Sequence, residues 1–216
     1  MNKCLAVLAA ILLGAAIWAP ASAAPLSHDQ ALRQLSSRKA EARHTAVQRL
    51  AEVGLMRDVA SLSRLLFDQD EEVRAATEAA LWKVWSRSGD ARIDGMYQKG
   101  VEQMNGGEAD AAVATFTEII RLKPDFAEGW NKRATLLFFM GRYQESLADC
   151  DEVMKRNPGH FGALAGYGQI HSRLENYDKA LAYFERALAI NPNMEGVAVN
   201  VVALRKLVTD RSKRAI

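Results

Sequence analysis

Apolar residues in the first part of the chain recur at steps of three and four positions. This spacing places apolar side chains on one face of an α-helix and therefore predicts helices. Residues 26–88 also contain no proline and none of the apolar–polar alternation that is typical of strands. The helices predicted here span Leu26–Leu35, Ala40–Val53, Val59–Phe67 and Glu71–Trp85.

Three prolines divide the second part of the chain into blocks of equal length. Pro124, Pro158 and Pro192 are separated by 34 residues in both intervals. A fixed period of this size indicates stacked structural repeats. Proline cannot continue a helix, so each one closes a block. Aligning the blocks on these prolines brings further residues into columns, among them Gly100, Ala134 and Gly168, then Ala112, Ser146 and Ala180, then Phe116, Cys150 and Phe184.

The aligned columns predict a helical hairpin in each block. Small residues allow two helices to cross closely, and large apolar residues fill the space beside the crossing. Gly141-Arg142 is a turn signal between two such helices, and the Gly106-Gly107 pair supplies the positive φ of the same turn one block earlier. We therefore expect three hairpins of similar size, packed side by side.

Residues 91–192 resemble three tetratricopeptide repeats. The middle block has Trp130, Ala134, Gly141, Tyr143 and Pro158 at signature positions. The third block has Gly168, Tyr177, Ala180, Phe184, Ala187 and Pro192. The first block is more divergent, with Met96 and Ala109 at two signature positions, and the middle block has Arg133 and Ser146 where the family has leucine and alanine. The resemblance implies an all-α fold, a right-handed α-solenoid that binds a peptide or protein.

Residues 24–90 contain a different, shorter repeat. Glu41-Ala42-Arg43 and Glu72-Val73-Arg74 lie 31 positions apart, and the same offset pairs Leu50 with Leu81. The segment that starts at Asp70, a predicted N-cap, resembles the second helix of a HEAT-type repeat. A HEAT-like pair is the favoured interpretation, with divergent tetratricopeptide repeats or unrelated helices as the alternative. We expect these helices to continue directly into the following repeats as one solenoid.

Residues 193–216 are expected to cap the stack and to end in a basic tail. Val197, Val201, Leu204 and Val208 recur at helical spacing, as a helix that covers the last apolar surface of a repeat stack requires. The basic residues are Arg205, Lys206, Arg211, Lys213 and Arg214. They suit a solvated helix end, where positive charge complements the helix dipole. A contact with an acidic partner or with lipid is the alternative.

Residues 1–23 have the pattern of a secretory signal peptide. Lys3 precedes the uncharged run Leu5–Ile17, and Ala21-Ser22-Ala23 is an A-x-A cleavage pattern. The run has 13 residues, which is short for a membrane span. We expect cleavage after Ala23 and a mature chain that is periplasmic, if the host is bacterial, or secreted. Retention of the segment as a membrane anchor is the alternative.

Composition and motifs indicate binding more than catalysis. The net charge of +2 offers no basic surplus for nucleic acid, so we expect no nucleic-acid partner. The histidines are not paired at metal-ligand spacing, and no phosphate-binding loop or nucleophile elbow occurs. Cys150 shares a column with two phenylalanines and is expected to be buried. We expect no enzyme activity, no metal and no cofactor, and no membrane contact once the signal segment is removed.

The first helices of the three blocks predict a concave binding surface. In stacked repeats the first helix of each hairpin lines the hollow face, and helical spacing selects the stripe that points into it. The candidate groove residues are Asp94, Tyr97, Val101, Met104, Glu128, Asn131, Thr135, Phe138, Ala165, Gln169, Ser172 and Arg173. Asn131 and Gln169 are expected to bind the main chain of an extended peptide, with Tyr97, Met104 and Phe138 as apolar anchors.

Some tetratricopeptide domains bind a C-terminal carboxylate with a clamp of lysines and asparagines. Its positions correspond here to Tyr97, Val101, Lys132, Gly162 and Gly166, and only Lys132 is cationic. We therefore expect a different mode of recognition. The hypothesis from sequence is a non-catalytic adaptor for a protein or peptide partner whose identity is open. The alternative is a periplasmic holdase, or a regulatory subunit of an envelope assembly machine.

Overall fold

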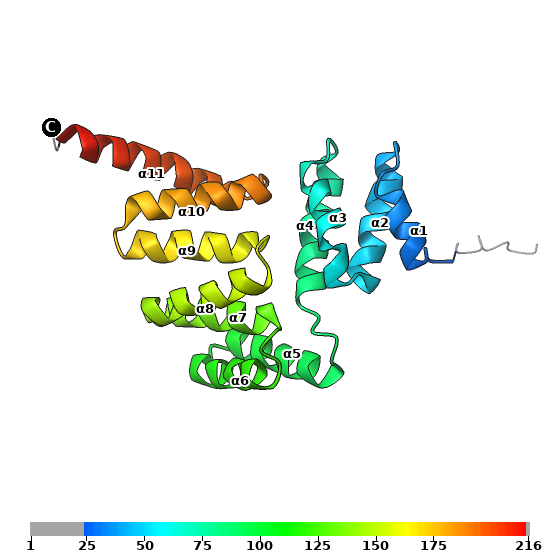
Figure 1. Cartoon of the computed structure of the whole chain (residues 1–216), viewed down its shortest axis with the longest axis horizontal. Helices are drawn as coiled ribbons and strands as arrows, with labels where there is room; N and C mark the ends of the chain where they lie inside the picture. Colours follow the sequence, from blue (N-terminus) through cyan, green and yellow to red (C-terminus); the bar gives the residue numbers. More distant parts are fainter. Residues whose placement is uncertain (1–23, 215–216) are drawn as a thin grey trace, which may run out of the picture.

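The computed structural model describes residues 24–214, and every regular element in that range is a helix (Figure 1). The predicted signal segment, residues 1–23, lies outside the described residues. The first helices are α1 (His28–Gln34), α2 (Ala40–Val53), α3 (Val59–Ser63) and α4 (Glu71–Trp85), which we call the N-terminal unit. The next six, which we call the repeat stack, are α5 (Ala91–Asn105), α6 (Ala109–Leu122), α7 (Ala127–Phe139), α8 (Tyr143–Arg156), α9 (Phe161–Arg173) and α10 (Tyr177–Ile190). The last helix is α11 (Glu195–Arg214).

The helix boundaries in the N-terminal unit follow the predictions closely. Both α2 and α4 begin and end at the predicted residues. The side chain of Asp70 accepts a hydrogen bond from the backbone N–H of Val73, so Asp70 is the N-cap of α4. The helix predicted over residues 59–67 is divided, because α3 ends at Ser63 and a 3-10 turn, Arg64–Phe67, follows.

Two arginines repeat the same contacts in both halves of the N-terminal unit. Arg43 donates to the carbonyl oxygens of Ser37 and Arg38, at 2.9 and 3.3 Å. Arg74 donates to those of Asp68 and Gln69, at 2.9 and 3.1 Å. Arg74, Asp68 and Gln69 each lie 31 positions after their counterparts Arg43, Ser37 and Arg38, which is the offset seen in the sequence. The offset therefore reflects two copies of one structural motif.

The hairpins of the repeat stack cross at the predicted small residues. A Cβ atom added at Gly168 would lie 2.5 Å from the Phe184 ring, and one added at Gly100 would lie 2.7 Å from the Phe116 ring. Phe116 and Phe184 are fully buried, so each ring fills the space that its glycine leaves open. The repeat stack thus consists of three hairpins, formed by α5 with α6, α7 with α8, and α9 with α10.

The turn inside each hairpin has one residue with positive φ. Gly107, Gly141 and Glu175 have φ values of 78°, 74° and 58° and are spaced by the 34-residue period. Glycine adopts this conformation without steric penalty, which agrees with the predicted turns. Glu175 has the same backbone geometry with a side chain present, so the third turn uses a residue that favours it less.

The N-terminal unit lies across the ends of the repeat helices. Figure 1 shows α4 running along the stack, where the turns that lead into α9 and α11 meet it. Phe161 from α9 belongs to the apolar core of the N-terminal unit. Asn193, just before α11, accepts a hydrogen bond from Arg74 at 3.0 Å and donates one to the carbonyl of Leu66 at 2.8 Å. This differs from the expected continuous solenoid, because Trp82 and Trp85 of α4 pack on the turn before α9 and α4 does not form a further layer on α5.

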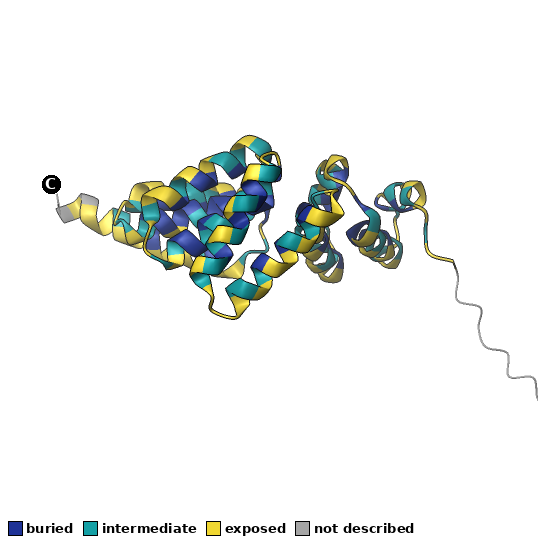
Figure 2. Cartoon of the chain, turned by 90° about the horizontal axis from the view of Figure 1, so that it is seen from below, coloured by how far each residue is buried: buried dark blue, intermediate teal, exposed yellow. Residues whose placement is uncertain are grey.

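Helix α11 caps the stack as predicted. Val197, Val201 and Leu204 are buried against α10, and of residues 205–211 all but the half-buried Val208 are exposed (Figure 2). The outer face is less polar than expected of a cap, because Val199 and Val202 are 67% and 70% exposed.

We expect Gly168→Ala to destabilise the protein because the added methyl group meets the buried ring of Phe184. Overpacking of this kind costs about 1–3 kcal/mol of unfolding free energy. Gly95→Ala on α5 is the matched control, because nothing outside its two chain neighbours and its own helix backbone lies within 4 Å of the new methyl group. This control should gain about 0.5–1 kcal/mol from helix propensity. Urea unfolding of both variants measures the effects, and equal stabilities would contradict the assigned helix crossing.

Candidate peptide-binding groove

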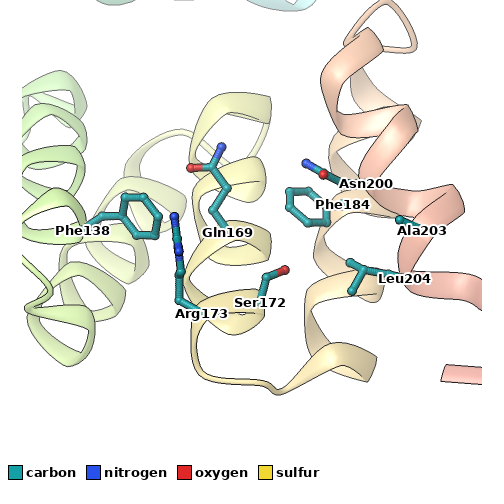
Figure 3. Close-up of a pocket in the computed structure, with 8 residues that line it drawn as sticks. All are labelled: Phe138, Gln169, Ser172, Arg173, Phe184, Asn200, Ala203 and Leu204. Atoms are coloured by element: carbon teal, nitrogen blue, oxygen red, sulfur yellow. The ribbon is translucent and has the colours of Figure 1, made fainter. Parts of the chain in front are cut away.

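Two adjoining pockets follow the first helices of the second and third hairpins and end on α11. The larger has a volume of about 380 Å³ and is shown in Figure 3. It is lined by Phe138 from α7, by Gln169, Ser172 and Arg173 from α9, by Phe184 from α10, and by Asn200, Ala203 and Leu204 from α11. The smaller, of about 70 Å³, shares Phe138 and Gln169 with it and continues to Asn131, Thr135, Gly162 and Gly166. Together the two pockets form what we call the α7–α11 groove.

Half of the predicted groove residues line this surface. The structure brings together Asn131, Thr135, Phe138, Gln169, Ser172 and Arg173. Periodicity did not identify Asn200, Ala203 and Leu204, since α11 was predicted only to cap the stack. Its apolar spacing placed Leu204 against α10, but Leu204 lies at the edge of that face and also borders the groove.

The other predicted residues lie elsewhere. Val101 and Met104 are partly buried in the apolar cluster between α5 and α6, and Ala165 is buried beside α10. Asp94 accepts a hydrogen bond from the backbone N–H of Ser88 at 2.7 Å, so it stabilises the link between α4 and α5. Tyr97 is buried with its ring 5.6 Å from that of Phe126, in the segment that leads into α7. The predicted α5 residues Tyr97, Val101 and Met104 therefore pack against neighbouring segments and do not line the groove.

Glu128 is the centre of a buried polar network behind the groove. Its carboxylate accepts hydrogen bonds from Nε2 of His160 at 2.6 Å, from Nδ2 of Asn131 at 3.1 Å and from the hydroxyl of Tyr97 at 3.4 Å. Nδ1 of His160 accepts from the backbone N–H of Ala163, so Nε2 carries the proton that is donated to Glu128. The amide nitrogen of Asn131 is thus engaged inside the protein, and only its oxygen can serve a peptide.

These hydrogen bonds govern the pKa of the Glu128 carboxyl. Burial alone would raise this pKa, because it disfavours the charged form. The hydrogen bond from His160, the nearby charge of Lys132 and the hydrogen bond from Asn131 together outweigh burial and hold the pKa below the ordinary value. Burial and the adjacent carboxylate raise the pKa of Tyr97, so its hydroxyl stays protonated. The network is therefore an ionised carboxylate held by hydrogen bonds from His160, Asn131 and Tyr97.

Tryptophans of the N-terminal unit cover one end of the repeat stack. Trp85 is stacked on His160 with ring centres 4.4 Å apart, and Trp82 contacts His160 edge-on at 5.3 Å. A Cβ atom at Gly162 would collide with the Trp82 ring, and Nζ of Lys132 lies 6.0 Å from its centre. Two of the carboxylate-clamp positions therefore face Trp82, and the open part of the groove is the end between Gln169 and α11.

The candidate catalytic side chains are packed inside the protein. Burial and two neighbouring aspartates raise the pKa of the Cys150 thiol to about 12. The His171 ring stacks on Tyr183 at 5.5 Å, and burial lowers its pKa. No group of three or more histidine, cysteine or acidic residues in the described part of the chain is placed to hold a metal. Among the described helices, none combines the length and apolar character needed to cross a membrane.

The fold and the groove define the class of protein, an α-helical repeat protein with a concave first-helix surface. Residues 93–126 and 125–193 each match a family model of the tetratricopeptide repeat. Residues 93–193 are therefore tetratricopeptide repeats, as the sequence pattern predicted.

Similar proteins share these repeats. A TPR repeat-containing protein of Rhizobium etli is 40% identical over 125 residues, covering 58% of this chain and 60% of that protein. The Hsp70-Hsp90 organizing protein of Triticum aestivum is 26% identical over 117 residues, covering 54% and 20%. The outer membrane protein assembly factor BamD of Caulobacter vibrioides is 27% identical over 121 residues, covering 54% and 36%. The chain thus spans less than two thirds of the length of these relatives.

Solved structures share the fold. The TPR domain of Arabidopsis OM64 has a TM-score of 0.52 at 27% identity, covering 53% of this chain and 95% of that chain. The first TPR of Spaghetti (RPAP3), bound to an HSP90 peptide, has a TM-score of 0.53 at 19% identity, covering 56% and 96%. The N-terminal unit lies outside the residues that the family models match.

We expect the stability that Glu128 contributes to be lost in acid. Because its pKa is lowered by folding, the contribution is present above the ordinary value of 4.5 and disappears as the pH falls through the folded value. Glu128→Gln should cost about 1–3 kcal/mol of unfolding free energy at neutral pH, since His160 loses its charged acceptor. The difference from wild type should shrink as the pH is lowered from 7 to 3.

Urea unfolding across this pH range measures the difference. Glu102→Gln, at an exposed position of α5, is the control for a change of carboxyl to amide. A wild-type advantage over Glu128→Gln that stays constant from neutral to acid pH would contradict the assigned ionised carboxylate.

Proposed function

We propose that this protein is a non-catalytic adaptor that binds an extended peptide segment of a partner protein in the α7–α11 groove. The observation that carries the proposal is the mixture of groups in the groove. Gln169 and Asn200 present amides, Ser172 a hydroxyl, and Phe138 and Leu204 apolar side chains. Amides satisfy the main chain of a peptide, and apolar recesses accept its side chains.

The lack of assembled chemistry in the groove supports binding over catalysis. Arg173 and Cys150 are the only titratable residues among those that line its two pockets. The thiol of Cys150 stays protonated because of burial. Glu128 and His160 are fully buried, and neither they nor the hydrogen-bonded pair His28 and Asp58 line either pocket. A substrate in the groove would thus meet no nucleophile paired with a base.

The similar proteins support peptide recognition by this class of repeat. One structural neighbour is a TPR domain bound to an HSP90 peptide, and one relative is an Hsp70-Hsp90 organizing protein. The carboxylate clamp is not part of our proposal, since Lys132 is the only cation at its positions and lies beside Trp82.

We also propose where the protein works and what its N-terminal unit is. The signal pattern of residues 1–23 supports a mature chain in the periplasm of a bacterial host, or a secreted one. The duplicated arginine contacts at the 31-residue offset support a HEAT-like pair in residues 24–90. In this proposal the unit supports the repeat stack and limits the groove to its open end.

The double variant Phe138→Ala plus Gln169→Ala should lose the partner. The wild-type protein is used to capture proteins from an envelope fraction of the native host, and the captured partner is then titrated against both forms. Loss of an apolar anchor and a main-chain amide should weaken binding by about 2 kcal/mol or more, which is roughly 30-fold.

Lys99→Ala, on the exposed surface of α5, is the matched control and should bind like wild type. The thermal midpoint of each variant shows whether the fold is kept. Equal affinity of a folded double variant and wild type would show that the partner binds elsewhere.

A second candidate function is a periplasmic holdase, and exposed apolar surface favours it. Phe139, Val199 and Val202 are 67–75% exposed and lie outside the core. Such surface can bind unfolded chains without sequence preference. Suppression of the aggregation of a denatured client protein at equimolar ratio, unaffected by the double variant above, would favour this function over the adaptor.

A further inference from the structure

The α7–α11 groove contains one charged side chain without a partner. Arg173 is exposed and forms no ion pair or hydrogen bond with any described residue. Arg133 on α7 and Arg205 on α11, by contrast, pair with Asp149 and Glu185, each at 2.7 Å. No aspartate or glutamate lines either pocket of the groove. The charge of Arg173 is therefore free to bind an anionic group from outside.

An apolar recess adjoins this cation. Figure 3 shows the Arg173 guanidinium next to the Phe138 ring, with Phe184, Ala203 and Leu204 on the opposite side of the pocket. The volume of about 380 Å³ is enough for one large aliphatic or aromatic side chain. A segment that brings only a charge to this site would leave the recess unfilled.

Two free amides lie in the same pocket. The side chains of Gln169 and Asn200 make no hydrogen bond within the described residues, in contrast to Asn131, whose amide nitrogen is bonded to Glu128. An amide offers both a donor and an acceptor, as the main chain of an extended peptide requires. The open end of the groove thus combines a cation, an apolar recess and main-chain contacts within one pocket.

We infer that the groove selects a protein segment in which an acidic side chain lies close to a large apolar side chain. The carboxylate binds Arg173, the apolar side chain enters the recess between Phe138 and Leu204, and Gln169 and Asn200 bind the main chain. The inference rests on the proposed function, because it names the kind of segment that the same groove binds.

Synthetic heptapeptides, acetylated and amidated so that they carry no terminal charge, test this specificity. Each has leucine at its centre and Asp, Asn or Lys one, two or three positions away, with alanine elsewhere. Wild type should bind an Asp peptide at least about tenfold more tightly than its Asn counterpart, because a charge-assisted pair replaces a neutral one. Arg173→Glu should reverse the preference, so that the Lys peptide binds more tightly than the Asp peptide.

Lys99→Glu is the matched control, because it changes the net charge equally at an exposed position of α5 outside both pockets. It should keep the wild-type preference. Phe138→Ala reports separately on the recess and should weaken all leucine peptides, whatever their charge.

The outcomes separate this inference from the proposed function. Binding that is lost in Phe138→Ala but does not distinguish Asp, Asn and Lys would overturn the inference and leave the peptide groove in place. Binding unaffected by both Phe138→Ala and Arg173→Glu would overturn the groove itself. Binding by none of these peptides, or binding that appears only when the same sequences are made with a free C-terminal carboxylate, would overturn the choice of an internal acidic side chain.

Discussion

The hydrogen bond between His160 and the buried carboxylate of Glu128 is the contact on which the rest of the structure depends. A charge buried without partners is strongly destabilising, so the parts that supply its donors must stay together. Tyr97 comes from α5, Glu128 from α7 and His160 from the turn before α9. Trp85 of the N-terminal unit stacks on the same imidazole. One network thus joins three hairpins and the unit beside them.

This junction determines which part of the concave surface can bind. Trp82 lies against Gly162 and near Lys132, so the N-terminal halves of α7 and α9 are covered from within the chain. The open end, between Gln169 and α11, is built on helices that the junction holds in position. A groove held in this way loses little conformational freedom when a peptide binds, which favours affinity at a modest contact area.

Periodicity predicted most of the fold, and half of the residues that it assigned to the groove line it. The 34-residue spacing of prolines located the hairpins, and α2 and α4 have the predicted bounds. The burial of Glu128 was not predictable from its own helix, because its partner His160 lies 32 positions further along the chain. Trp85 ends α4 and packs on His160 and Phe161, which lie far along the chain, so its packing on the repeat stack was not predictable either.

Site-specific photo-crosslinking in the native host tests the central claim, that the open end of the α7–α11 groove is the working surface. A photoreactive phenylalanine derivative is introduced at Gln169, inside the groove, and in a separate variant at Lys99, outside it. The account predicts a discrete adduct with another protein from position 169 and none from position 99. An adduct from position 99 with none from position 169, in folded protein, would contradict it.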